Sequence, residues 1–203
     1  AGPGFGGSCF KKDILNLIYI CKHYGLDKVA DYWEQVININ SWQISRITQI
    51  IVEKLFGTVS GKRLVILGFS FKANTNDTRE SPAIYICQKL MIEGGNLIIY
   101  DPKVDYSQIE NDLNKKMASI EEIDHSEGEW YKSKNIYNAV QDADAVILLT
   151  EWDQFINLDW ERISNSMRKP SWIFDTRYLL DPRIISSINI NYWRIGYGDK
   201  RGI

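Results

Sequence analysis

Apolar residues recur at helical spacing in the first quarter of the chain. Between residues 9 and 24 they gather on one helical face, and Gly25 follows where a helix commonly ends. A longer apolar stripe begins near Asp27, and neither proline nor glycine interrupts it before Gly57. Its members are Val29, Trp33, Val36, Ile37, Ile44, Ile47, Ile50, Ile51 and Leu55. The pattern predicts two consecutive helices, the second about 28 residues and roughly 42 Å long. That length is typical of a helix with more than one packing partner, although a simple core helix would show the same stripe.

The periodicity becomes strand-like after Lys62. Short apolar runs typical of buried strands occupy residues 64–67, 97–100, 145–149 and 172–174, with a weaker one at 192–195. Helical stretches lie between them, most clearly at residues 81–92 and 159–167. This alternation predicts an α/β fold in which a doubly wound parallel sheet follows the long helix.

One segment, residues 111–134, does not follow the alternation. It is polar and charged and has no clear period. We expect it to form a surface excursion that is partly disordered.

Composition limits the possible functions. With 203 residues, 44% of them hydrophobic, the chain can bury one good core or a domain with an extension. The net charge of −2 predicts no general nucleic-acid-binding surface, and no apolar run approaches the roughly 20 residues of a membrane span. The N-terminus lacks a signal-peptide pattern, and three cysteines suit reduced thiols in a cytoplasmic protein. His23 and His125 have no cysteine or histidine at metal-ligand spacing, so we expect no structural metal.

The strongest chemical signal is Cys9, which follows the glycine-rich run Gly-Pro-Gly-Phe-Gly-Gly-Ser. Glycines this dense occur where the backbone must approach a ligand or adopt positive φ. Two lysines and Asp13 follow at the predicted start of a helix, and cations together with a helix N-terminus stabilise a thiolate. A cysteine beside glycines is more often structural, so this string must be weighed with the rest of the chain.

A long polar segment, residues 68–82, follows the first predicted strand. Ser81 can cap the next helix, and Pro82 suits its first turn. Lys72 and Arg79 are therefore expected where cations and backbone donors would hold a pyrophosphate. A dinucleotide site in this domain, with Asp101 on a ribose, is disfavoured because the motif Gly-x-Gly-x-x-Gly is missing.

Residues 4–13 resemble the catalytic-cysteine loop of the UDP-glucose 6-dehydrogenase family. Five further motifs occur in that family's order: Gly68-Phe69-Ser70-Phe71-Lys72, Asp77-Thr78-Arg79-Glu80-Ser81, Tyr100-Asp101-Pro102-Lys103, Thr150-Glu151-Trp152-Asp153 and Phe174-Asp175-x-Arg177. The resemblance covers nearly the whole chain outside residues 111–134 and is greatest to the animal-type enzymes.

The resemblance implies a division of the chain. Residues 1–60 would form the cysteine loop and a central helical dimerisation region, and residues 61–203 a UDP-sugar-binding domain. The family's N-terminal NAD-binding Rossmann domain would be absent, so we expect a fragment without a complete active site. The implied partners are UDP-glucose and a second copy of the chain, in a homodimer or higher homo-oligomer.

The implied activity is oxidation of UDP-glucose to UDP-glucuronate by two NAD molecules. Cys9 would be the nucleophile that carries a thiohemiacetal and then a thioester. Asp13, one helical turn on, matches the aspartate that positions or activates water. Lys12 matches a lysine near the cofactor, and Arg79 an arginine that reaches NAD. An ion pair of Arg79 with Asp77 or Glu80 is the alternative role.

The resemblance also assigns substrate contacts. Gly4, Phe5 and Gly6, with Gly7, would wrap the sugar and its phosphates, and a tight turn that requires glycine explains them equally well. Phe71 and Lys72 match a substrate-contacting pair, and Arg177 a substrate-binding arginine. Some relatives have a second basic residue where this chain has Tyr178.

Other motif residues are expected to be structural. Asp101, Asp153 and Asp175 read as strand-end caps and loop anchors, and Cys21 and Cys87 as small core residues. Two other functions stay open. The chain could belong to a dehydrogenase of another nucleotide sugar, such as a UDP-hexosamine or GDP-mannose, or be a catalytically silent binding and dimerisation module.

Overall fold

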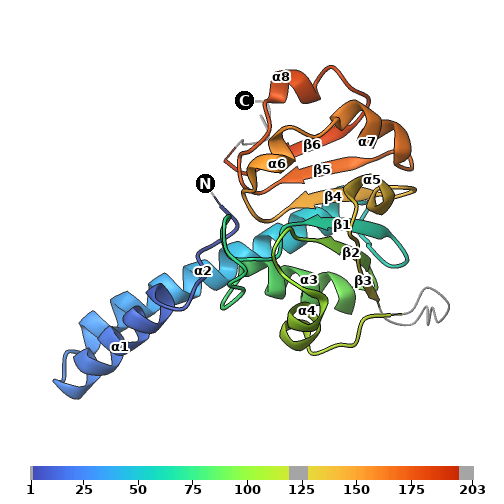
Figure 1. Cartoon of the computed structure of the whole chain (residues 1–203). Coiled ribbons are helices and arrows are strands. Elements are labelled where there is room, and N and C mark those ends of the chain that lie inside the picture. The colour runs from blue at the N-terminus through green and yellow to red at the C-terminus, as the bar shows by residue number, and fades with distance from the viewer. Residues whose placement is uncertain (1, 119–127, 197–203) are drawn as a thin grey trace, which may run out of the picture.

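The computed structural model describes residues 2–118 and 128–196. Two antiparallel helices, α1 (Phe10–His23) and α2 (Asp27–Lys54), open the fold. The N–H groups of Gly25 and Leu26 donate to the carbonyls of Lys22 and Cys21, and Gly25 has φ +68°, so α1 ends in a Schellman motif. Figure 1 shows α1 and the first part of α2 projecting away from the rest of the molecule. We call residues 2–43, which comprise the glycine-rich loop with Cys9, α1 and the first part of α2, the arm, and residues 44–196 the sheet domain.

The sheet domain contains one parallel sheet of six strands among the described residues. The strand order is β3-β2-β1-β4-β5-β6, and every neighbouring pair is parallel. The chain moves outward from β1 to β3 and then returns to add β4 on the other side of β1, so the switch point lies between β1 and β4. The strands are β1 (Arg63–Leu67), β2 (Asn96–Tyr100), β3 (Trp130–Lys132), β4 (Ala145–Leu148), β5 (Trp172–Asp175) and β6 (Asn191–Arg194).

Helices cover both faces of the sheet. One apolar core joins the sheet to the end of α2 and to α3 (Pro82–Ile92) and α4 (Tyr106–Leu113). A second core joins the other face to α5 (Ile136–Ala139), α6 (Asp153–Ile156), α7 (Trp160–Ser166) and α8 (Pro182–Ile185). Alternate residues of each strand face opposite cores, as Val65 and Ile66 do in β1, which explains why the strands are apolar throughout.

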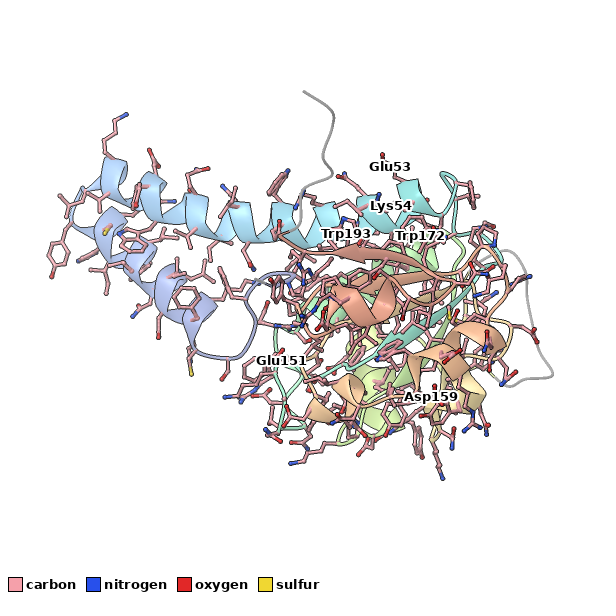
Figure 2. The ribbon with its side chains drawn as sticks, turned by 90° about the horizontal axis from the view of Figure 1, so that it is seen from above. Glu53, Lys54, Glu151, Asp159, Trp172 and Trp193 are labelled. Atoms are coloured by element: carbon pink, nitrogen blue, oxygen red, sulfur yellow. The ribbon has the colours of Figure 1, made fainter. Side chains whose placement is uncertain are left out.

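The C-terminal part of α2 is an integral part of the sheet domain. Ile47 and Ile51 are completely buried there. The Lys54 ammonium lies 5.4 Å from the centre of the Trp172 ring, and Figure 2 shows Lys54 beside Trp172 and Trp193. One continuous helix therefore connects the arm rigidly to the sheet.

The predicted α/β architecture, long helix and five strands are confirmed. The prediction for residues 111–134 is wrong at both ends, because residues 111–113 complete α4 and residues 130–132 form β3. Trp130 is fully buried, and its indole N–H donates to the carbonyl of Lys115. Residues 119–127, with His125, lie outside the described residues. Within the described part of the chain, no helix combines the length and hydrophobicity needed to cross a bilayer.

Candidate active site

The carboxyl ends of the strands meet at one edge of the sheet, and the switch point between β1 and β4 lies there, where ligands of such sheets commonly bind. Gly68, directly after β1, has φ +91°, and a Cβ atom on it would lie 2.3 Å from Cβ of Thr150. Only glycine permits this approach. The Thr150 hydroxyl donates to the carbonyl of Ser70 at 2.6 Å, which ties the loops after β1 and β4 together.

Asp101 joins three of the sequence motifs. Its Oδ2 accepts hydrogen bonds from the backbone N–H groups of Phe69 and Ser70 and from the Trp152 indole N–H. Its Oδ1 accepts from the N–H groups of Lys103 and Val104. The prediction that Asp101 is a strand-end anchor is therefore confirmed.

Asp175 has the same role after β5. Its carboxylate accepts from the backbone N–H groups of Arg177, Leu179 and Leu180 and from the Tyr192 hydroxyl. Burial and the neighbouring Asp175 raise the pKa of Tyr192 far above its ordinary value, so this hydroxyl stays a donor. Asp153 is the first residue of α6, where a carboxylate interacts favourably with the helix dipole.

Arg177 is held in a nearly buried position just after β5, with 12% of its side chain exposed. Its Nε donates to the carbonyl of Leu149 at 2.7 Å and its Nη2 to the carbonyl of Phe71 at 3.2 Å. Its Nη1 lies 3.2 Å from Oε2 of Glu151, a residue that Figure 2 labels on the side of the sheet domain nearest the arm. Burial lowers the pKa of Arg177, and the Glu151 carboxylate opposes this shift.

The glycine-rich loop lies between α2 and the segment that precedes α3. Asn40 of α2 binds both backbone groups of Phe5: its Oδ1 accepts from the N–H at 2.8 Å, and its Nδ2 donates to the carbonyl at 3.2 Å. A Cβ atom on Gly6 would lie 2.3 Å from the carbonyl oxygen of Glu80. Gly6 therefore has no room for a side chain.

Gly7 completes this contact. Its N–H donates to the carbonyl of Arg79 at 2.9 Å, and its φ is +88°. A Cβ atom there would lie 3.0 Å from the Phe71 ring. Phe71 thus touches the cysteine loop with its ring and Arg177 with its carbonyl.

Cys9 occupies the N-cap position of α1 and is exposed to solvent. The Ser8 hydroxyl lies 3.6 Å from its sulfur. The N–H of Asp13 donates to the Cys9 carbonyl at 2.8 Å, which fixes Asp13 one turn above the thiol. Phe5 and Phe10 stack edge to face across the loop with their ring centres 4.7 Å apart.

The remaining predicted cations surround this loop. The Lys72 ammonium lies 5.3 Å from the centre of the Phe71 ring, and Lys12 is exposed on α1. The guanidinium of Arg79 donates two hydrogen bonds to the Asp77 carboxylate, at 2.9 and 2.7 Å. This ion pair is the alternative role considered for Arg79. These bonds lower the pKa of Asp77. They also raise the pKa of Arg79.

Several residues that position the loop were not predicted. The Lys11 ammonium lies 2.7 Å from Oε2 of Glu80, and the Tyr85 hydroxyl donates to the same oxygen at 2.8 Å. The hydrogen bond to Glu80 raises the pKa of Lys11. Burial would raise the pKa of Glu80, but the hydrogen bonds from Lys11 and Tyr85 outweigh it and lower the pKa. Because Lys11 and Glu80 are 69 positions apart, no local pattern indicates this pair.

The structure thus brings the loop around Gly4, Phe5 and Gly6 together with Phe71 and Arg177 at one edge of the sheet. Arg79 reaches the same loop through its backbone. Neither the Asp13 carboxylate nor the Lys12 ammonium makes a recorded contact with a site residue in the described chain.

Two family models match this chain. A model described as the UDP binding domain of the UDP-glucose/GDP-mannose dehydrogenase family matches residues 65–182. A model of the central domain of the same family matches residues 1–42.

Individual proteins match over nearly the whole chain. A UDP-glucose 6-dehydrogenase from Drosophila melanogaster is 49% identical over 196 residues, which cover 97% of this chain and 41% of the fly protein. One from Caenorhabditis elegans is 45% identical, with 97% and 40% covered. The solved structure of a UDP-glucose dehydrogenase from Pyrobaculum islandicum has a TM-score of 0.73 at 25% identity, covering 98% of this chain and 39% of the archaeal one. The chain spans about two fifths of the length of the fly and worm relatives.

Proposed function

The chain belongs to the UDP-glucose/GDP-mannose dehydrogenase family, and we propose that it supplies the catalytic cysteine and the UDP-sugar site of an NAD-dependent UDP-glucose 6-dehydrogenase. One observation carries this proposal. The loop that ends at the exposed Cys9 is docked, through Gly7, on Phe71 at the edge of the sheet where Arg177 is held. These contacts support a single site that combines the thiol with the Arg177 guanidinium.

Oxidation of a primary alcohol to a carboxylate removes two hydrides, and the intermediate aldehyde must not escape. The Cys9 thiolate adds to the carbonyl carbon of the aldehyde, and the new oxyanion takes up a proton, giving a thiohemiacetal. Loss of the second hydride and of the hydroxyl proton gives a thioester. Water then attacks this thioester, the C–S bond breaks, and UDP-glucuronate leaves with the thiol restored.

Asp13 is suited to direct that water. The hydrogen bond between its N–H and the Cys9 carbonyl places it on the first turn of α1, and both residues are exposed. A carboxylate at this place accepts a hydrogen bond from water and receives its proton as the nucleophile forms. The N-terminus of α1 favours the thiolate both as nucleophile and as leaving group.

The edge of the sheet around Arg177 is suited to a sugar diphosphate. The buried guanidinium of Arg177 is fixed by two carbonyls and one carboxylate, so it presents a preorganised charge at the carboxyl ends of β4 and β5. We propose that Arg177 and Lys72 hold the substrate phosphates or hydroxyls. Phe71 and the backbone of Gly4, Phe5 and Gly6 line the sugar.

The residues on the loop also fit NAD. Arg79 and Lys12 are exposed cations near Cys9, able to pair with a pyrophosphate, and Arg79 can exchange its exposed bond to Asp77 for such a ligand. When bound, NAD accepts the hydride in each of the two oxidations. We propose that an NAD-binding domain outside these 203 residues binds most of the cofactor.

The arm is proposed to mediate homodimerisation. Its exposed apolar side chains include Leu15, Tyr19, Ile20, Val29, Tyr32, Ile39 and Trp42. Several exposed apolar side chains on two neighbouring helices favour an interaction surface. On this proposal residues 1–60 form the catalytic loop and dimerisation region, residues 61–203 form the UDP-sugar domain, and the protein works in the cytoplasm with reduced thiols.

Calorimetric titration of the chain with UDP-glucose, with GDP-mannose as the comparison ligand, tests the substrate assignment. We expect selective binding of UDP-glucose, weakened about tenfold in Lys72→Met, since a charge-assisted contact to a phosphate contributes about 1.5–3 kcal/mol. The control is Lys28→Met, which removes an exposed lysine from the arm and should bind like the unchanged chain. Stronger binding of GDP-mannose, or equal binding by the Lys72 variant, would contradict the assignment.

A further inference from the structure

Glu80 contacts the cysteine loop on both sides of the thiol. On the N-terminal side, a Cβ on Gly6 would lie 2.3 Å from the Glu80 carbonyl oxygen. The Gly7 N–H donates to the carbonyl of Arg79, the residue before Glu80. On the C-terminal side, the Glu80 carboxylate pairs with Lys11, two residues after Cys9. Residues 79 and 80 therefore fix the backbone before Cys9 and the first turn of the helix after it.

The backbone of Glu80 is strained. Its φ is +55°, in the left-handed region that residues other than glycine, asparagine and aspartate rarely occupy. Such a conformation persists only where surrounding contacts over-determine it, and it is concentrated at functional sites. Here the Tyr85 hydroxyl, the Lys11 ammonium and the packed Gly6 provide those contacts.

Packing does not explain the position of the Lys11 side chain. A cavity of about 170 Å³ lies beside it, between α2 and α3, and is lined also by Ile44, Thr48 and Tyr85. Because Lys11 borders open space, the carboxylate of Glu80 is what directs its ammonium toward the segment before α3. The side chains of Lys11 and Glu80 are 32% and 37% exposed.

We infer that Glu80 is a positioning residue for Cys9, clamping the glycine loop and the first turn of α1 onto the segment that carries Arg79. The inference deepens the proposed function and rests on it for the role of Cys9. Glu80 itself touches no reacting atom. It links the cation assigned to the cofactor with the loop of the nucleophile, so that both move as one unit.

Two substitutions remove the contact between Glu80 and Lys11 without adding strain to the backbone at position 80. Glu80→Gly and Glu80→Asn both suit a positive φ, so neither introduces backbone strain. Both remove the charged tether to Lys11. The matched control is Glu34→Gln, which removes the ion pair between Lys22 and Glu34 that joins α1 to α2 away from the loop.

Hydrogen exchange of the chain measures the clamp without any turnover. We expect the Gly7 amide to exchange at least fivefold faster in both Glu80 variants, and at the unchanged rate in Glu34→Gln. Unaltered protection of Gly7 in the Glu80 variants would overturn the inference. This result stands even if the dehydrogenase assignment fails, because the measurement needs neither substrate nor cofactor.

Kinetics then test the consequence for the thiol, in a longer protein that carries this chain behind an NAD-binding domain. A displaced nucleophile lowers kcat, by about tenfold in Glu80→Asn, while KM for UDP-glucose stays within about twofold. The charge-swapped pair Lys11→Glu with Glu80→Lys should recover most of the lost kcat. A raised KM with unchanged kcat, or no recovery in the swapped pair, would count against a positioning role.

Discussion

The arm and the sheet domain share one helix but bury it very differently. In the sheet domain, Ile47 and Ile51 of α2 are fully buried in a core that includes strands and two further helices. In the arm, the same helix shares only a small core with α1, formed by Ile14, Ile18, Cys21 and Ala30 with partly buried neighbours. Ile39 and Trp42 remain more than half exposed.

This difference separates what the chain completes by itself from what it does not. The sheet domain closes its cores on both faces, and its own residues make the hydrogen bonds and the ion pair that hold Arg177. The arm carries the thiol and positions it through contacts made back onto the sheet domain, while its outer apolar surface has no counterpart in the described chain. The nucleophile and the proposed phosphate-binding cations therefore lie in different parts of the molecule, and each can be disrupted separately.

The largest expected effect separates chemistry on the arm from binding in the sheet domain. Cys9→Ser, assayed in the longer dehydrogenase, should reduce UDP-glucuronate formation to background, because a hydroxyl is not ionised at neutral pH and forms no thioester. Binding of UDP-glucose by calorimetry should stay within about twofold, since phosphate recognition dominates affinity. Two-step turnover in this variant would show that Cys9 is not the nucleophile.

Stability should differ sharply between two positions on α2. Ile51→Ala opens a cavity in a closed core and should lower the free energy of unfolding by about 2–5 kcal/mol. Trp42→Ala, on the exposed face of the arm, should change it by no more than about 0.5 kcal/mol. Denaturant unfolding at a protein concentration low enough to keep the chain monomeric measures both. Equal losses at the two positions would mean that the arm is as well packed as the sheet domain.

The exposed face of the arm should instead govern self-association. Ile39→Asp combined with Trp42→Asp places charges in the proposed interface and should raise the dimer dissociation constant at least tenfold, or about 1.4 kcal/mol. Sedimentation equilibrium gives the constant, and Lys28→Met serves as a control at an exposed position on the same helix. An unchanged dissociation constant would mean that this face of the arm does not form the interface.

Sequence patterns predicted the regular elements well because their signals are local. The uninterrupted apolar stripe from Val29 to Leu55 is sufficient to predict α2, and short apolar runs are sufficient to predict five of the strands. β3 was missed because it has three residues, of which only Trp130 is fully buried, and its existence depends on pairing with β2. The helix α4 was missed because Ile109 and Leu113 are its only buried residues.

The site was predictable only where it resembles known motifs. The positions of Cys9, Phe71 and Arg177 were inferred from motif strings, and the fold brings their segments together. The contacts of Asn40 and Glu80 with the cysteine loop have no sequence signal, although Glu80 lies in a motif, because each acts on residues 35 or more positions away. The sequence left two roles open for the Arg79 side chain, a contact with NAD or an ion pair with Asp77 or Glu80. Its bond to Asp77 depends on the turn between residues 77 and 79.

The smallest expected effect concerns the ion pair that ties the arm to the sheet domain. The pKa of Glu80 is lowered from 4.5, so its contribution to stability is present above that pH and is lost as the pH falls. The pKa of Lys11 is raised from 10.5, so its contribution is present below that pH and is lost as the pH rises. The pair should therefore stabilise the fold between about pH 5 and 10.

Both side chains are about one third exposed, which limits the gain to a few tenths of a kcal/mol. Unfolding of the chain and of Glu80→Gln, followed from neutral pH into acid, should give a difference that shrinks as the falling pH protonates the Glu80 carboxylate. The same comparison for Glu34→Gln, whose ion pair is 3.9 Å long and more exposed, should show a smaller difference still. A difference at Glu80 that stays the same as the pH falls would mean that shape and hydrogen bonding, rather than charge, hold the arm at this point.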